Sequence, residues 1–131
     1  MKTKKQPLIL LLSILLLSVL AACAGGGDAP AQTVELYHEA LVAKDQDRLI
    51  NFSCADWEST ALLELDSFVS VETELVGVSC ETVSEEDGQA RVQCEGVITA
   101  TYDGEARDFP LSNRTFLVVQ EGGDWRLCGY E

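Results

Sequence analysis

Residues 76–98 read VGVSCETVSEEDGQARVQCEGVI, and this stretch decides the fold because it describes a β-hairpin. On both sides of the segment 84–88 (SEEDG), apolar and polar side chains alternate with the period of two that is typical of a strand. The segment itself is rich in turn-forming residues. We therefore predict two antiparallel strands, over about 69–83 and 89–102.

One register places the apolar side chains of both strands on the same face. It pairs Ser84 with Ala90, Cys80 with Cys94, Val78 with Gly96 and Val76 with Ile98. A slip of one residue would turn this apolar set towards solvent. In this register one face carries Val76, Val78, Ala90, Val92 and Ile98, and the other carries Glu81, Arg91, Gln93 and Glu95.

The rest of the sheet follows downstream of the hairpin. Asp103-Gly104 is a hairpin turn, and a third run, 106–121, is predicted to break at 110–113 because proline cannot donate to a strand ladder. Gly122-Gly123 then leads into a last strand over 125–130. The result is an antiparallel meander.

Helical periodicity dominates the chain before the hairpin. We predict a helix over 33–44 with Thr33 as its N-cap, and a short helix over 48–52 capped by Asp45 or Asp47. A third helix should begin near Ser53 or Asp56, with one face formed by Ala61, Leu62, Leu65, Phe68 and Val69. Helices followed by a meander indicate an α+β fold, with the helices packed on a curved antiparallel sheet.

The helices and strands together contain four cysteines: Cys54, Cys80, Cys94 and Cys128. An even count in an exported chain favours two disulfides. The hairpin register makes Cys80–Cys94 a cross-strand disulfide, which leaves Cys54–Cys128 to join the helices to the last strand. A second scheme, Cys54–Cys80 with Cys94–Cys128, requires Cys94 to reach past the third strand. A zinc site is not expected, because there is no C-x-x-C pair and the chain has a single histidine.

The N-terminus has the layout of a secretory signal. Lysines at positions 2, 4 and 5 precede an apolar run over 8–20 that is too short to span a membrane comfortably. Leu20-Ala21-Ala22-Cys23 resembles the lipobox of bacterial lipoproteins, which implies that residues 1–22 are removed and that Cys23 is acylated. An ordinary secretory cut with a free Cys23, or a buried core helix, are the alternatives.

These features divide the chain into the signal 1–22, a lipidated tether 23–32 and a single domain 33–131. The expected location is the cell membrane or outer membrane, with the domain facing an extracytoplasmic compartment.

The chain has 9 basic and 22 acidic residues, and without the three signal lysines its formal charge falls from −13 to −16. This acidity argues against a nucleic-acid partner, and the lipid alone accounts for membrane attachment.

The domain resembles the cone-shaped nuclear transport factor 2-like fold. The resemblance rests on the opening Val34-x-x-Tyr37-His38-x-Ala40-Leu41, the acidic turn Lys44-Asp45-x-Asp47-x-Leu49 and the closing Gly122-Gly123-Asp124-Trp125. It implies a bent sheet wrapped around a long helix, with a pocket at the wide end of the cone. His38 stands where another aromatic residue is commoner. The fold hosts isomerases, dehydratases, assembly modules and binding domains, so it does not define a function.

Candidate pocket residues are Tyr37, His38, Glu72, Glu74 and Tyr102; the register places the two glutamates opposite Tyr102 and Ala100. We expect a non-catalytic domain that binds a small molecule or an envelope partner protein, without a cofactor. One alternative is a small lyase or isomerase that uses His38 as a general base in a secluded pocket. Another is a purely structural envelope lipoprotein. No Ser/His/Asp set is apparent, and the acidic turn 84–88 lacks the spacing of a calcium loop.

Overall fold

Three helices open the domain in the computed structural model, which describes residues 27–131. Helix α1 (Ala29–Ala43) is capped by Asp28, whose side chain accepts a hydrogen bond from the amide of Ala31. Helix α2 (Gln46–Asn51) is capped by Asp45, as expected. Helix α3 (Glu58–Phe68) follows a turn and has no side-chain cap.

The predicted start of the first helix is wrong. Helix α1 begins at Ala29, so residues 29–32 belong to the helix and not to the tether, and Thr33 lies buried inside the helix. Its hydroxyl donates to the carbonyl of Ala29. Proline at position 30 is compatible with this start, because the first turn of a helix does not need that amide hydrogen.

Helix α3 begins at Glu58, close to the predicted start at Asp56, and Ser53 is not part of it. The Ser53 hydroxyl instead donates to the carbonyl of Leu49 at 2.8 Å, inside the preceding helix. The α3 face is also narrower than predicted, because Val69 lies beyond the helix end and is 58% exposed. Ala61 and Leu65 are buried as expected.

The sheet is an antiparallel meander in which strands pair in the order β1-β2-β4-β5, and β3 pairs with β2 beyond the end of β4. A 3-10 turn, η1 (Leu111–Asn113), interrupts the third run where the break was predicted. The strands are β1 (Glu72–Glu86), β2 (Gln89–Tyr102), β3 (Glu105–Pro110), β4 (Thr115–Glu121) and β5 (Asp124–Tyr130). The α+β prediction is confirmed.

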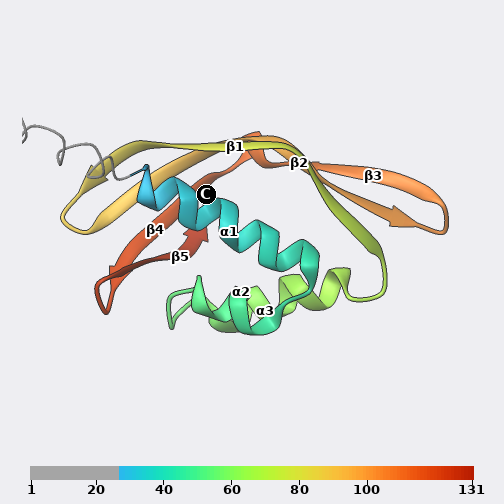
Figure 1. Ribbon diagram of the computed structural model, residues 1–131, viewed down its shortest axis with the longest axis horizontal. Helices are drawn as coiled ribbons and strands as arrows, with labels where there is room; N and C mark the ends of the chain where they lie inside the picture. Colours follow the sequence, from blue (N-terminus) through green and yellow to red (C-terminus); the bar gives the residue numbers. More distant parts are fainter. Residues whose placement is uncertain (1–26) are drawn as a thin grey trace, which may run out of the picture.

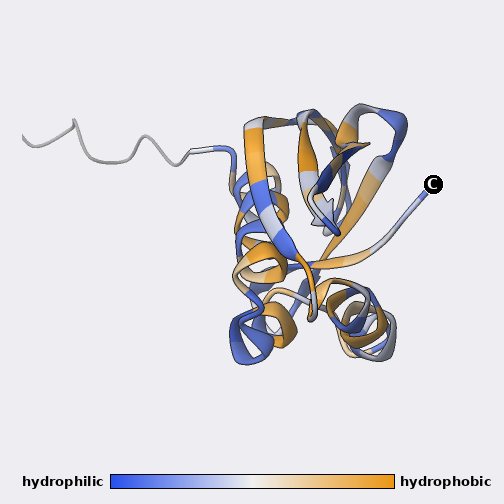
Figure 2. Ribbon diagram, turned by 90° about the vertical axis from the view of Figure 1, so that its right-hand side faces the viewer, coloured by the Kyte–Doolittle hydropathy of each residue, from blue (hydrophilic) through white to orange (hydrophobic). Residues whose placement is uncertain are grey.

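The curved sheet forms one layer and the helices form the other. Helix α1 runs across the concave side of the sheet, with α2 and α3 on its far side (Figure 1). Along the strands, orange apolar segments alternate with blue polar ones (Figure 2). The core lies between these layers and includes Val34, Tyr37, Leu49, Val92, Phe116 and Leu127.

The predicted hairpin register holds only in the middle of the hairpin. Cys80 pairs with Cys94 as expected, but a bulge between Val76 and Ser79 shifts the pairing on one side by one residue, and a second between Thr82 and Ser84 shifts it on the other. An extra residue in one strand offsets every later pair. As a result Val76 is 47% exposed, while Leu75 packs against the core in its place.

Two glycines make the first bulge possible. Gly77 and Gly96 have φ angles of +64° and +91°, a backbone conformation that other residues adopt only with strain. A Cβ atom on Gly96 would lie 2.6 Å from the backbone of Gly77, so the two strands approach too closely there for any side chain.

Both disulfides of the first scheme are present. Cys54–Cys128 joins the segment between α2 and α3 to β5, and Cys80–Cys94 links β1 to β2. Next to the first bridge, the Cys54 amide donates to the carbonyl of Leu127 at 2.9 Å. The pairing of Cys54 with Cys80 is therefore excluded.

Helix α1 also engages the outer edge of β1. The backbone amide of Cys80 donates to Glu35 at 2.8 Å, and the amide of Thr82 donates to Asp28 at 2.6 Å. The hydroxyl of Thr82 donates to Asp28 as well. Acidic side chains of α1 thus occupy donors that a neighbouring strand would otherwise use.

Candidate functional site

A pocket of about 470 Å³ opens between α1, α3, the η1 turn and the end of β5. Its walls are largely apolar and come from all of these elements and from β2. They include Leu41, Phe68, Ile98, Leu111 and Phe116. The predicted apolar face of β2 is buried as expected, at Ala90, Val92, Cys94, Ile98 and Ala100, but only Ile98 of this set reaches the pocket.

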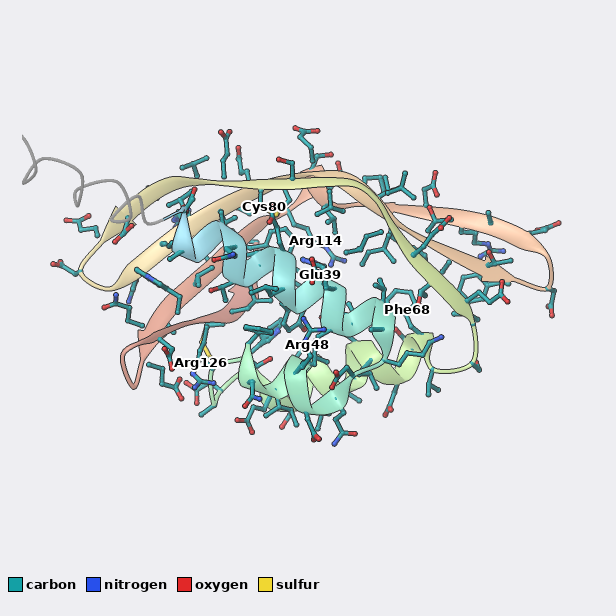
Figure 3. The ribbon with its side chains drawn as sticks, viewed as in Figure 1. Glu39, Arg48, Phe68, Cys80, Arg114 and Arg126 are labelled. Carbon is teal, nitrogen blue, oxygen red and sulfur yellow. A yellow bond between two sulfur atoms is a disulfide. The ribbon has the colours of Figure 1, made fainter. Side chains whose placement is uncertain are left out.

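Polar side chains gather in the same pocket. They are Tyr37 and His38 from α1, Glu64 and Ser67 from α3, Asn113 and Arg114 from the η1–β4 junction, and Tyr130 from β5. In the view of Figure 3, Arg114 is drawn between the sheet and α1, and Phe68 lies at the end of α3. An apolar cavity with a few convergent polar groups is the usual form of a small-molecule site.

His38 is buried and neutral. Its Nδ1 lies 2.8 Å from the carbonyl oxygen of Val34, and because a carbonyl only accepts, Nδ1 carries the proton. Burial lowers the pKa of His38 from 6.5 to about 4, and the positive charge of Arg114 acts in the same direction, while the Val34 bond opposes them. The ring packs edge-on against Phe116, with 5.0 Å between ring centroids.

The other ring nitrogen of His38 is therefore an acceptor. Among residues 27–131 no protein group donates to Nε2. The ring lines the pocket, and Nε2 is its unused acceptor. A ligand hydroxyl or amine, or a water molecule, can donate to it.

Tyr37, Glu64 and Trp57 form a connected set beside His38. The Tyr37 hydroxyl donates to Glu64 Oε2 at 2.6 Å and accepts from Trp57 Nε1 at 3.3 Å. Burial, together with the negative charge of Glu64, raises the pKa of Tyr37 well above its usual 10.0. Tyr37 thus stays protonated and holds the Glu64 carboxylate in place.

Arg114 stacks on Tyr130 at the rim of the pocket. Its guanidinium carbon lies 4.0 Å from the centre of the Tyr130 ring, a cation–π geometry. Burial, with a further contribution from the charge of Glu64, raises the pKa of Tyr130. Within residues 27–131, no carboxylate lies within ion-pair distance of Arg114.

Of the five pocket residues that were predicted from the sequence, the structure places two in the pocket and three outside it. Tyr37 and His38 line the pocket, whereas Glu72, Glu74 and Tyr102 do not. The bulge at Gly77 pairs Glu72 with Thr101 and Glu74 with Thr99, so the predicted partners are wrong by one residue, and both glutamates are exposed. Tyr102 lies beside Arg107 at the far end of β2.

Glu64, Arg114 and Tyr130 were missed by the sequence reasoning. Glu64 carried a signal, since it lies three residues after Ala61 and four before Phe68 on the inner face of α3. Arg114 carried none, because its place depends on how the η1 turn redirects the chain. Tyr130 was placed on the last strand without a role.

Other kinds of site find no support in the part of the chain that the structure describes. No group of three or more His, Cys, Asp or Glu side chains in residues 27–131 could hold a metal ion. Over the same residues, no helix is long and apolar enough to cross a membrane. The signal 1–22 and Cys23 lie outside the described residues.

The architecture is shared with several solved structures. An ntf2-like protein with a cystatin-like fold from Novosphingobium aromaticivorans is 13% identical, with a TM-score of 0.53 over 79% of this chain and 77% of that one. The fold is nuclear transport factor 2-like. A protein with a cystatin-like fold from Caulobacter vibrioides is 16% identical, with a TM-score of 0.54 over 76% of this chain and 82% of that one.

A third neighbour of this nuclear transport factor 2-like domain is a SEC-C motif-containing protein from Rhodopseudomonas palustris. It is 12% identical, with a TM-score of 0.53 over 80% of each chain. No protein-family profile and no curated protein matches the sequence. At these identities the likeness concerns the fold alone.

Proposed function

We propose that this domain binds a small molecule in the pocket between α1, α3 and the η1–β4 junction, and that it does so without catalysis. The observation that carries the proposal is the pocket itself, about 470 Å³ in volume, with largely apolar walls and polar side chains from α1, α3, β5 and the η1–β4 junction. The volume falls within the range of roughly 300–1,000 Å³ that is usual for small-molecule sites.

The state of His38 supports binding over catalysis. An effective general base has a pKa near the pH at which it works, whereas the pKa of His38 is lowered to about 4. Its Nδ1 donates to a helix carbonyl and not to a carboxylate that would stabilise a charged imidazolium. His38 is suited to orient a ligand by accepting one hydrogen bond.

A lyase or isomerase that uses His38 is the second candidate. One observation favours it, since His38 lines a pocket that also contains Tyr37 and Glu64. Because the chain has a single histidine, NMR can follow the His38 Hε1 resonance directly in the free and ligand-bound protein. A bound-state pKa between 6 and 7 would favour the enzyme, and a pKa that stays below 5 would favour binding.

The binding experiment uses N-phenyl-1-naphthylamine, an uncharged apolar dye whose fluorescence rises in apolar surroundings. Ser67 is exposed, lies on α3 and lines the pocket, so Ser67→Trp should obstruct the mouth and abolish the fluorescence gain. Ser59 is exposed on the same helix but does not line the pocket, which makes Ser59→Trp the matched control. Equal dye binding by both variants would refute the pocket as the binding site.

We further propose that the domain is anchored by lipid on Cys23 at an extracytoplasmic membrane surface. The lipobox-like Leu20-Ala21-Ala22-Cys23 behind an apolar run supports this proposal, as do two disulfides, which form in oxidising compartments. Mass spectrometry of the membrane fraction should find an N-terminal peptide that begins at an acylated Cys23. An unmodified chain that retains residues 1–22 would contradict the anchor.

A further inference from the structure

Arg114 is the basic side chain that the fold leaves available at the pocket. The five other basic residues of the described chain have partners elsewhere: Lys44 donates to the carbonyl of Val71, Arg107 stacks on Tyr102, and Arg48, Arg91 and Arg126 pair with carboxylates. Of these six residues, only Arg114 lines the pocket. It is a local positive charge on a strongly acidic domain.

Arg114 lies over the Tyr130 ring, and this contact leaves its hydrogen-bond donors free. A guanidinium that lies over a ring uses its face, whereas its five N–H groups point outward in the plane. Within residues 27–131, no protein acceptor is hydrogen-bonded to these groups. The guanidinium carbon thus lies 4.0 Å from the centre of the Tyr130 ring, and the donors of this pocket-lining arginine are unused.

Glu64 lies near Tyr130, but it forms no ion pair with Arg114 among residues 27–131. Its carboxylate accepts the Tyr37 hydroxyl at 2.6 Å. Glu64 is thus hydrogen-bonded by Tyr37, and in the described residues Arg114 has no acidic partner within 4 Å. An anionic group on a ligand would balance the charge of Arg114 and accept hydrogen bonds from it, since a guanidinium can donate two parallel hydrogen bonds to one carboxylate.

The walls next to Arg114 indicate the body of such a ligand. Phe116 contacts both His38 and Tyr130 edge-on, with centroid distances of 5.0 and 6.1 Å, and Phe68 meets Phe109 at 5.9 Å. Rings arranged in this way offer edges and faces to a flat apolar group.

We propose that the pocket takes a small apolar carboxylate, with the carboxylate on Arg114 and a flat body among the aromatic side chains. This inference rests on the proposed binding function and specifies its ligand class. In it Arg114 contacts the ligand directly, and the Tyr130 ring positions Arg114.

The test compares three molecules that share one ring system. They are 2-naphthoate, the uncharged 2-naphthylmethanol and the cationic 2-naphthylmethylamine, and their dissociation constants are measured by isothermal titration calorimetry at low salt. We expect 2-naphthoate to bind about tenfold more tightly than the alcohol, the contribution of one charge-assisted pair. We expect the amine to bind more weakly than the acid.

Arg114→Gln should remove the advantage of 2-naphthoate and leave the affinity for 2-naphthylmethanol within about twofold of the wild type. Arg107→Gln is the matched control, since Arg107 also stacks on a tyrosine but does not line the pocket. The Arg107→Gln variant should still bind 2-naphthoate more tightly than 2-naphthylmethanol. Urea unfolding checks that both variants fold, which is expected because both arginines are exposed.

Two results overturn the carboxylate proposal while the binding function stands. One is equal affinity of the wild type for acid and alcohol, or tighter binding of the amine. The other is an advantage for 2-naphthoate that survives Arg114→Gln. If none of the three molecules binds and N-phenyl-1-naphthylamine also fails to bind, the proposed function itself is refuted.

Discussion

Burial of His38 should make the stability of the domain depend on pH in a way that one substitution can isolate. The folded state holds the imidazole neutral and lowers its pKa from 6.5 to about 4. The unfolded chain therefore binds more protons between these two values, and the free energy of unfolding falls as the pH falls through that window. His38→Phe removes the titrating group and keeps a ring between Tyr37 and Phe116.

The size of the effect follows from the two pKa values. Near pH 7.5 the histidine is neutral in both states and contributes almost nothing. Near pH 5 it is almost fully protonated when unfolded and about one-tenth protonated when folded, which costs the native state about 2 kcal/mol. Stopping near pH 5 limits the interference from carboxylates, most of which titrate at lower pH.

The assay is urea unfolding followed by tryptophan fluorescence, on the wild type and His38→Phe, at several pH values from about 7.5 to 5 with the disulfides intact. The quantity of interest is the difference between the two pH profiles, because the carboxylates contribute equally to both. The wild type should lose about 2 kcal/mol more than the variant over this range. The Hε1 resonance of the single histidine should titrate with a midpoint below 5.

Parallel pH profiles, within about 0.5 kcal/mol, would refute the reasoning, because they would mean that His38 titrates alike in both states. An NMR midpoint near 6.5 would refute it independently. In that event the ring would have to be solvated, and its assignment as a neutral acceptor in the pocket would be wrong as well.

Three further predictions concern the scaffold, each measured by urea unfolding. Replacing both cysteines of Cys54–Cys128, which lie 74 residues apart, should lower the free energy of unfolding by about 4.5 kcal/mol, and replacing those of Cys80–Cys94, 14 residues apart, by about 3 kcal/mol. The unfolded chain gains more entropy when the longer loop is opened, so the reverse order would contradict this reasoning. Gly96→Ala should lower the free energy of unfolding by more than about 3 kcal/mol, because the new Cβ would meet the backbone of Gly77. In Gly77→Ala the new Cβ meets no atom within 4 Å, so the loss should be only about 1–2 kcal/mol, and equal losses would refute the close approach. Asp28→Ala should cost about 1–2 kcal/mol, more than Asp45→Ala, because Asp28 caps α1 and also holds Thr82, and a smaller loss than that of Asp45→Ala would argue against this double role.

The meander and its disulfides were predictable because two independent patterns agreed. Period-two alternation located the strands, and the register that paired Cys80 with Cys94 also gathered the apolar side chains on one face. The register was right only between the two bulges. Gly77 and Gly96 are visible in the sequence, but a bulge is recognisable only when the partner strand shows where an extra residue is accommodated.

The site was predictable only as far as it lies on regular elements. Tyr37 and His38 were proposed from the resemblance to the nuclear transport factor 2-like fold, and they lie on a regular helix that forms where it was expected. Glu72 and Glu74 were misplaced because a single bulge moved them by one residue, which is enough to reverse a side chain on a strand. Arg114 escaped because its direction is set by a 3-10 turn and by stacking on Tyr130, a residue 16 positions later in the chain.

The contacts between the start of α1 and the edge of β1 affect how copies of this domain would meet on a membrane surface. Proteins held on one membrane by short tethers meet one another far more often than free ones, and an edge strand with unused amide hydrogens invites a second copy to add its own strand. Here the amides of Cys80 and Thr82 are already bound by carboxylates of Glu35 and Asp28. If Cys23 anchors the chain as proposed, only four residues separate the lipid from Asp28, so the segment nearest the membrane also opposes the addition of a neighbour's strand at this part of the β1 edge.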